Sequence, residues 1–196
     1  TDITNAINAG AILVNHEDHG APDKWGYPRY TTSNIDNLNN GDNKLPVVFS
    51  MNCQSGWFDN ETDNEPATPD SVVYFAEKFL RRSGAGAVGV VAATRTTFSG
   101  HNESINKGMI DGIWSDFLSY SQSGPFASPQ RYMGHVLDYG KMYYASVFSA
   151  TTVRKIQFEA YHYFGDPAMQ IWIAPPTQMS VSHAEQCEPG ATSFDV

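Results

Sequence analysis

Two residue types suited to nucleophilic catalysis each follow a short apolar run of this sequence. The run at residues 11–14 leads into His16 and His19, and the run at residues 45–51 leads into Cys53. The anion of a thiol is accessible near neutral pH and is strongly nucleophilic. A neighbouring imidazole can accept the thiol proton and later protonate a leaving amine. A cysteine and a histidine brought together in this way predict acyl transfer.

The two side chains are expected to meet because the runs that precede them are typical of neighbouring strands. Three continuously apolar runs, a pattern that indicates strands buried on both faces of a parallel sheet, lie at residues 11–14, 45–51 and 87–93. Ligands of such sheets bind outside the carboxyl ends of the strands. Cys53 is therefore a candidate nucleophile, and a histidine of the segment 16–19 is its candidate general base. Gly20 permits close backbone approach, and its N–H and that of Cys53 are predicted to form an oxyanion hole.

Other interpretations of these residues remain open at this point. Cysteine is often a small buried hydrophobe, and His19 is equally well explained as a loop residue. His16, His19 and Cys53 are also possible zinc ligands, but the sequence offers no clear fourth ligand. We expect His16 to be a solvated loop residue.

Helical periodicity accompanies the strand pattern. Residues 70–82 repeat apolar side chains with a period near 3.6, which predicts a helix. Residues 94–102 form a polar loop, and further elements are predicted as helices at 103–120, 131–148 and 153–163 and a strand at 169–173. Strands that alternate with helices favour an α/β sandwich with a mainly parallel sheet, here over residues 1–174. Residues 175–196 have short alternating segments, which are expected to begin a β-sandwich module.

Composition and charge exclude several classes of protein. The 196 residues are 41% hydrophobic and 13% aromatic, which is typical of a folded globular chain. Twelve basic against 21 acidic residues give a net charge of −9, with an isoelectric point near 4.9, so nucleic acid is not an expected partner. No apolar run approaches the length of about 20 residues that crosses a bilayer.

Several separated motifs together resemble the gingipain family of cysteine peptidases. Cys53 follows His19 of the pair His19-Gly20 by 34 residues, an interval similar to that of the family's catalytic pair. The resemblance is also carried by Trp25, the strand 87–93, the loop 94–103, Phe164-Gly165-Asp166-Pro167 and the segment 176–181. The resemblance implies a caspase-like α/β/α sandwich followed by the start of an immunoglobulin-like domain. It also implies peptide-bond hydrolysis through a Cys53–His19 dyad and a thioacyl-enzyme, with no cofactor for catalysis. An extracellular location and protein or peptide substrates follow from the same resemblance.

The resemblance also bears on substrate preference and on metal binding. Gingipains prefer a basic residue before the scissile bond, but Asn102, with Glu103 beside it, stands where lysine-specific members carry an acid. Phe98 stands where the family often carries a tryptophan as a pocket wall, so Phe98, Asn102 and Glu103 are the pocket residues that the resemblance implies, with Trp57 beside them. Phe98 and Trp57 are each expected either in the cleft or in the core. Family members bind structural calcium, for which the sequence offers an acidic loop with Asp59, Glu61, Asp63 and Glu65.

The family fold has two strands upstream of the strand that bears the histidine. We therefore expect an upstream part of the same catalytic domain, with any acid that orients His19. Two rival functions remain: a binding or surface protein that keeps the scaffold without turnover, and a transpeptidase that passes the same acyl-enzyme to an amine.

Overall fold

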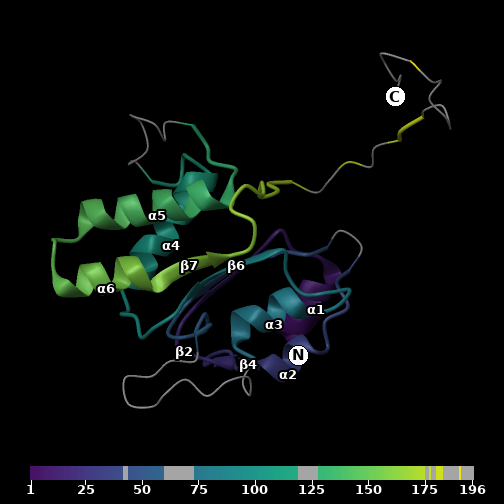
Figure 1. Cartoon of the computed structure of the whole chain (residues 1–196), viewed down its shortest axis with the longest axis horizontal. Helices are drawn as coiled ribbons and strands as arrows, with labels where there is room; N and C mark the ends of the chain where they lie inside the picture. The colour runs from purple at the N-terminus through teal and green to yellow at the C-terminus, as the bar shows by residue number, and fades with distance from the viewer. Residues whose placement is uncertain are drawn as a thin grey trace.

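A four-stranded sheet with helices on both faces forms the centre of the protein (Figure 1). The computed structural model describes residues 1–41, 44–59, 73–118, 128–174, 177, 180–182 and 190. The helices are α1 (Asp2–Ala9), α2 (Thr32–Ile35), α3 (Phe75–Arg81), α4 (His101–Ile113), α5 (Met133–Val147) and α6 (Thr152–Ala160). The strands are β1 (Leu13–Glu17), β2 (Gly20–Ala21), β3 (Lys24–Trp25), β4 (Tyr30–Thr31), β5 (Val47–Met51), β6 (Gly89–Ala93) and β7 (Tyr161–Phe164).

The main sheet has the order β1-β5-β6-β7, in which the first three strands are parallel and β7 is antiparallel. Strands β2, β3 and β4 form a separate small antiparallel sheet. β5 and β6 are buried along their whole length, as continuously apolar runs in a parallel sheet should be. The predicted α/β class with a mainly parallel sheet is thereby confirmed.

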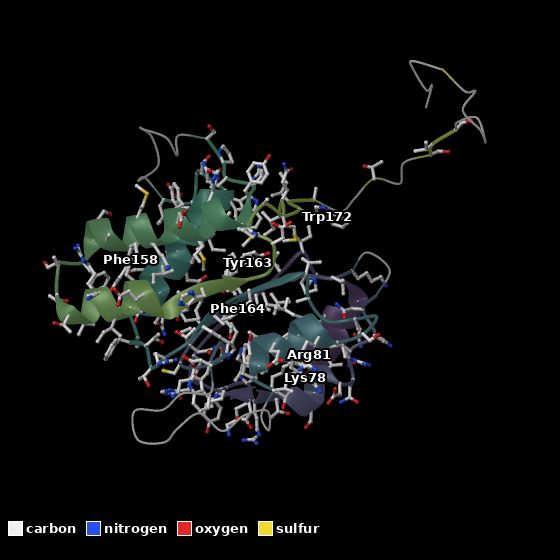
Figure 2. The ribbon with its side chains drawn as sticks, viewed as in Figure 1. Lys78, Arg81, Phe158, Tyr163, Phe164 and Trp172 are labelled. Atoms are coloured by element: carbon white, nitrogen blue, oxygen red, sulfur yellow. The ribbon has the colours of Figure 1, made fainter. Side chains whose placement is uncertain are left out.

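The sheet has one hydrophobic core on each face, and successive side chains of a strand point to opposite faces of the sheet. Phe49 and Met51 of β5 pack in the core under α4, α5 and α6, whereas Val48 packs in the core under α1 and α3. The antiparallel strand β7 repeats the pattern, since Tyr163 contacts the first core and Phe164 the second (Figure 2). These two cores make the molecule a three-layer sandwich.

Several predicted elements differ from the observed ones. Helix α5 matches the prediction for 131–148 closely, but α4 ends at Ile113 rather than 120. The helix predicted for 153–163 ends at Ala160, because the aromatic residues that follow join the sheet as β7. The strand predicted for 169–173 contributes a single bridge, between Gln170 and Tyr132.

Short elements around the first two strands escaped the sequence patterns. Helix α1 and the small sheet β2-β3-β4 were not predicted, and their segments are too short for a periodicity to be read. Helix α3 begins at Phe75; residues 70–72 of its predicted span lie outside the described residues. Most of 175–196 also lies outside them, so the β-sandwich start and the domain boundary remain predictions. No helix among the described residues is long and apolar enough to cross a bilayer.

Candidate active site

Cys53 lies in a tight turn at the carboxyl end of β5. The turn is hydrogen-bonded to the end of β6 and to the segment that follows it: Gly56 N–H donates to the Ala93 carbonyl (2.9 Å), and Gln54 N–H donates to the Arg95 carbonyl (3.2 Å). Gln54 has a φ of 59°, a left-handed conformation that such a sharp turn requires. Cys53 itself is half-buried.

The Cys53 sulfur hydrogen-bonds to Thr97, in the loop that follows β6. Thr97 N–H donates to Sγ at 3.4 Å, and the thiol donates to the Thr97 carbonyl at 3.5 Å. The Thr97 hydroxyl is 3.8 Å from the same sulfur. Sequence analysis placed residues 94–102 in a loop near the site but gave no reason to single out Thr97.

His19 and Gly20 enter the site on the hairpin formed by β2 and β3. Gly26 N–H donates to the His19 carbonyl at 2.7 Å, and Gly20 pairs with Trp25 in the antiparallel register. Bonded pairs alternate along such a ladder, so Gly20 occupies a non-bonded position of the edge strand. Its N–H therefore faces outward from the small sheet and takes no part in the ladder.

Gly20 packs directly against the turn that carries Cys53. A Cβ at Gly20 would lie 2.8 Å from the Cys53 carbonyl oxygen and 2.2 Å from Asn52 Oδ1, both closer than real Cβ contacts allow. Only glycine fits between the hairpin and the turn. The expected close backbone approach at this residue is therefore observed.

Helix α3 holds the hairpin and the cysteine turn together. The first N–H groups of a helix lack partners within it. Here Phe75 N–H donates to the Pro22 carbonyl of the hairpin (2.7 Å), and Ala76 N–H donates to the Ser55 carbonyl of the turn (2.9 Å). The two segments that carry the candidate dyad thus share one support.

The side chains of His19 and Cys53 lie at the same edge of the sheet and are not hydrogen-bonded to each other. His19 is exposed, and its backbone N–H donates to the Asp18 carboxylate. Catalytic hydrogen bonds are often formed only when substrate binds. The absence of a hydrogen bond between them in this structure is therefore compatible with a dyad that forms on substrate binding.

His16 is buried, and the expectation that it is a solvated loop residue is wrong. It belongs to β1 and is 6% exposed. Its ring stacks in parallel on the indole of Trp25, with centroids 4.3 Å apart. Nε2–H donates to the Tyr27 carbonyl (3.0 Å), and Nδ1 accepts from Asn52 Nδ2 (3.0 Å). Burial lowers the pKa of the imidazole, and the Tyr27 carbonyl and Asp18 oppose that shift only in part.

The contacts of His16 also bear on the zinc interpretation. Both ring nitrogens are engaged in hydrogen bonds, so neither offers a lone pair to a metal without a rearrangement. No cluster of three or more metal-ligating side chains occurs within the part of the chain that the structure describes.

A buried polar network continues from His16 beneath the site. Asn52 Nδ2 donates to Ser50 Oγ at 2.9 Å, and Trp25 Nε1–H donates to the same oxygen at 2.8 Å. With both lone pairs of Ser50 used, its proton is directed to Ser55 Oγ, 2.8 Å away. Asn52 Oδ1, next to Gly20, is buried with no hydrogen-bond partner. No sequence pattern predicts this network, because its members are common polar residues without a motif.

The predicted pocket residues divide into two groups. Phe98 is exposed and Trp57 is half-buried beside the cysteine turn. Asn102 is buried, and its Oδ1 accepts from Gln157 Nε2 at 2.6 Å, while Gln157 Oε1 accepts from Phe98 N–H at 3.1 Å. Glu103 is exposed and forms an ion pair with Lys107 (2.6 Å). Asn102 thus supports the loop around Phe98 through Gln157, a residue that sequence analysis missed.

One of the four predicted calcium ligands lies within the described residues. The Asp59 carboxylate takes two hydrogen bonds from the Arg95 guanidinium, at 3.1 and 2.7 Å, which is a bidentate ion pair. A calcium ion would have to compete with this pair for Asp59. Glu61, Asp63 and Glu65 lie outside the described residues, so the calcium site stays a prediction.

An apolar cavity of about 570 Å³ lies at the opposite edge of the sheet. It is lined by residues that precede β1, β5 and β6, among them Ile12, Leu45 and Val88, and by Trp172, which Figure 2 labels. Because Cys53 and His19 follow the carboxyl ends of the strands, this cavity is separate from the candidate active site.

The fold resembles that of solved cysteine peptidases. The crystal structure of the Arg-specific cysteine proteinase gingipain R superposes with a TM-score of 0.73, covering 95% of this chain and 39% of that one at 24% identity. A complex of the Porphyromonas gingivalis RgpB pro- and mature domains gives a TM-score of 0.72 at 23% identity, covering 95% of this chain and 40% of that one. These likenesses establish the fold.

Sequence comparison identifies the family. Residues 1–172 match peptidase family C25, and the chain belongs to that family. It is 26% identical to gingipain R2 of Porphyromonas gingivalis over 207 aligned residues, covering all of this chain and 24% of gingipain R2. It is also 26% identical to gingipain R1 of the same organism, covering 94% of this chain and 17% of gingipain R1. The chain thus spans about a quarter or less of these relatives.

Proposed function

We propose that this chain carries the catalytic dyad of a cysteine endopeptidase, with Cys53 as nucleophile and His19 as general base. The observation that carries the proposal is the packing of Gly20 against the Cys53 carbonyl, with the Gly20 N–H turned out of its ladder. Membership of peptidase family C25 supports the reaction class and implies protein substrates. The extracellular location implied by the resemblance is part of the same proposal.

The proposed chemistry has two half-reactions. His19 accepts the thiol proton as the Cys53 sulfur attacks the scissile carbonyl carbon, and the carbonyl oxygen becomes an oxyanion that accepts from the Gly20 and Cys53 N–H groups. The C–N bond then breaks, and His19 gives the proton to the leaving amine. A water molecule, deprotonated by His19, attacks the thioester and releases a carboxylic acid and the free thiol.

The structure supports a role for Thr97 in the resting site. Its N–H, 3.4 Å from Sγ, can stabilise a developing thiolate, whereas its carbonyl, at 3.5 Å, accepts from the neutral thiol. The sulfur must turn away from the carbonyl to attack a substrate. Phe98 follows Thr97 and is exposed, so it is our proposed wall for the side chain that precedes the scissile bond.

The proposal is tested by intact-mass analysis of the full-length protein after exposure to peptidyl acyloxymethyl ketones that differ only in the residue beside the reactive group. We expect one adduct in the parent and none in Cys53→Ala. The latter keeps Cys187 and so controls for indiscriminate thiol labelling. The residue that gives the fastest labelling identifies the pocket preference.

Two results would overturn the assignment. Folded full-length protein that no ketone labels would leave a scaffold with a binding role. Equal labelling of the parent and Cys53→Ala would place the reactive thiol elsewhere. A transpeptidase would label in the same way, and ligated products formed from a peptide substrate and an added amine would identify it.

A further inference from the structure

His16 connects three segments that meet at the proposed oxyanion site. It lies on β1, its ring stacks on Trp25 of β3, and its Nδ1 accepts a hydrogen bond from Asn52, the residue before Cys53. Gly20 pairs with Trp25 and packs against the Asn52 side chain. Both proposed oxyanion donors thus adjoin direct partners of the His16 ring: Cys53 follows Asn52 in the chain, and Gly20 lies against Trp25 and Asn52.

The hydrogen bonds fix the tautomer of His16. Nε2 faces the Tyr27 carbonyl, which only accepts, so Nε2 carries the proton. Nδ1 is then the acceptor for an N–H of Asn52. The second N–H of Asn52 is bonded to Ser50, which leaves Oδ1 as the atom that lies against Gly20. The neutral imidazole therefore determines which end of the Asn52 amide contacts the Gly20 backbone.

We propose that His16 is a positioning residue: through Asn52 and Trp25 it sets the separation of the Gly20 and Cys53 N–H groups that receive the oxyanion. The inference rests on the proposed function, because it concerns the geometry of that reaction. Both ring nitrogens of His16 are bonded to other groups, so the proposal gives His16 no part in proton transfer.

The contacts of His16 suggest a specific variant. His16→Phe keeps an aromatic ring to stack on Trp25 and removes both hydrogen-bonding nitrogens, so that Asn52 loses its acceptor. His135→Phe makes the same chemical change on α5 at an exposed side chain and serves as the matched control. His16→Gln restores an acceptor for Asn52 without the imidazole and tests rescue.

Two reagents distinguish positioning from loss of structure. A peptidyl acyloxymethyl ketone must seat its carbonyl in the oxyanion site, whereas iodoacetamide needs only an accessible thiolate. In full-length His16→Phe we expect ketone labelling of Cys53 to slow about 10- to 100-fold, with an unchanged rate of iodoacetamide alkylation and partial recovery in His16→Gln. A merely structural role would change both rates together, and that result would overturn the proposal.

Amide NMR tests the positioning role of His16 without relying on peptidase activity. We expect the Gly20 and Cys53 amide resonances to move in His16→Phe and not in His135→Phe. Unmoved resonances, or equal ketone rates in the parent and His16→Phe, would overturn the inference even in an active enzyme. If the parent resists every ketone, the proposed function fails, and the resonances still decide whether His16 sets the position of these two amides.

Discussion

The two faces of strand β5 differ in the chemistry that they bury. On the face toward α4, α5 and α6, Phe49 and Met51 pack in an apolar core. On the opposite face, which also carries the core residue Val48, Ser50 lies in a chain of hydrogen bonds that joins Trp25, Asn52 and Ser55. An apolar core of this kind stabilises the sheet without directing any reactive group. The polar face instead specifies the positions of the hairpin and the cysteine turn.

This comparison predicts that changes on the polar face alter reactivity more than stability, and that changes in the helical layer do the reverse. The largest expected effect is at Gly20. Gly20→Ala would place a Cβ 2.2 Å from Asn52 Oδ1 and 2.8 Å from the Cys53 carbonyl, so the hairpin must move away from the turn. We expect ketone labelling of Cys53 to fall by more than about 100-fold, measured by intact mass.

Gly84→Ala is the control for a loss of stability alone. Gly84 has a φ of +69° with open space around its Cβ position, so the substitution costs about 1–2 kcal/mol through the backbone and touches nothing near Cys53. Its labelling rate should equal that of the parent. Comparable slowing in both variants would show that labelling follows stability and would remove the distinction between the two faces.

The second prediction concerns the helical layer, where α4 and α5 are joined by a buried hydrogen bond. Tyr139 Oη–H donates to Asp111 Oδ2 at 2.6 Å, and Leu118 N–H donates to Oδ1 at 2.6 Å. Tyr139→Phe removes one donor from a buried carboxylate. We expect the free energy of unfolding to fall by about 2 kcal/mol, measured by urea denaturation, with an unchanged labelling rate of Cys53 in the folded protein.

Tyr132→Phe removes a hydroxyl from an exposed tyrosine next to the same helix and should change stability little. If Tyr139→Phe were no less stable than Tyr132→Phe, the Asp111 contact would contribute nothing to the helical layer. If it slowed labelling as Gly20→Ala does, the two faces would be coupled and the comparison would not hold.

The sequence predicted the sheet better than the elements that hold the site. The runs ending at Met51 and Ala93 became β5 and β6, because a continuously apolar run has few alternatives to a buried strand. The same runs placed Cys53 at a strand end. The pattern failed at 161–164, where pairing with β6 overrides the helical periodicity of the preceding residues.

The support of the site was less accessible to sequence reasoning. His16 was misjudged because its burial depends on Trp25 and Asn52, which approach it from segments distant in sequence. Thr97 and Gln157 act through single tertiary hydrogen bonds and leave no periodic signal. Gly20 was identified for its conformational freedom, and the structure supplies the reason, namely the contact with the Cys53 turn.

The smallest predicted effect is a dependence of stability on pH that comes from His16. Burial lowers the pKa of this imidazole below its ordinary value of 6.5, so the folded protein releases a proton that the unfolded chain still binds just below that pH. The contribution of the lowered His16 pKa to the free energy of unfolding is complete above pH 6.5. It is lost as the pH falls toward and through the pKa of His16 in the folded protein. Of the described groups near the ring, Asp18 favours the charged form, as does the Tyr27 carbonyl, and Trp25 and Asn52 are neutral.

Urea denaturation between pH 7.5 and 5 measures this effect as a difference between the parent and His16→Phe. The parent should lose more stability on acidification than the variant, because only the parent has an imidazole at this position that stays neutral when folded and binds a proton when unfolded. His162, whose pKa burial also lowers, is present in both proteins and cancels in the difference. Parallel curves would mean that the His16–Asn52 bond survives protonation, with the amide turned so that Oδ1 accepts from Nδ1–H. In that case Nδ2 would face Gly20, and acid should alter ketone labelling of Cys53 without altering stability.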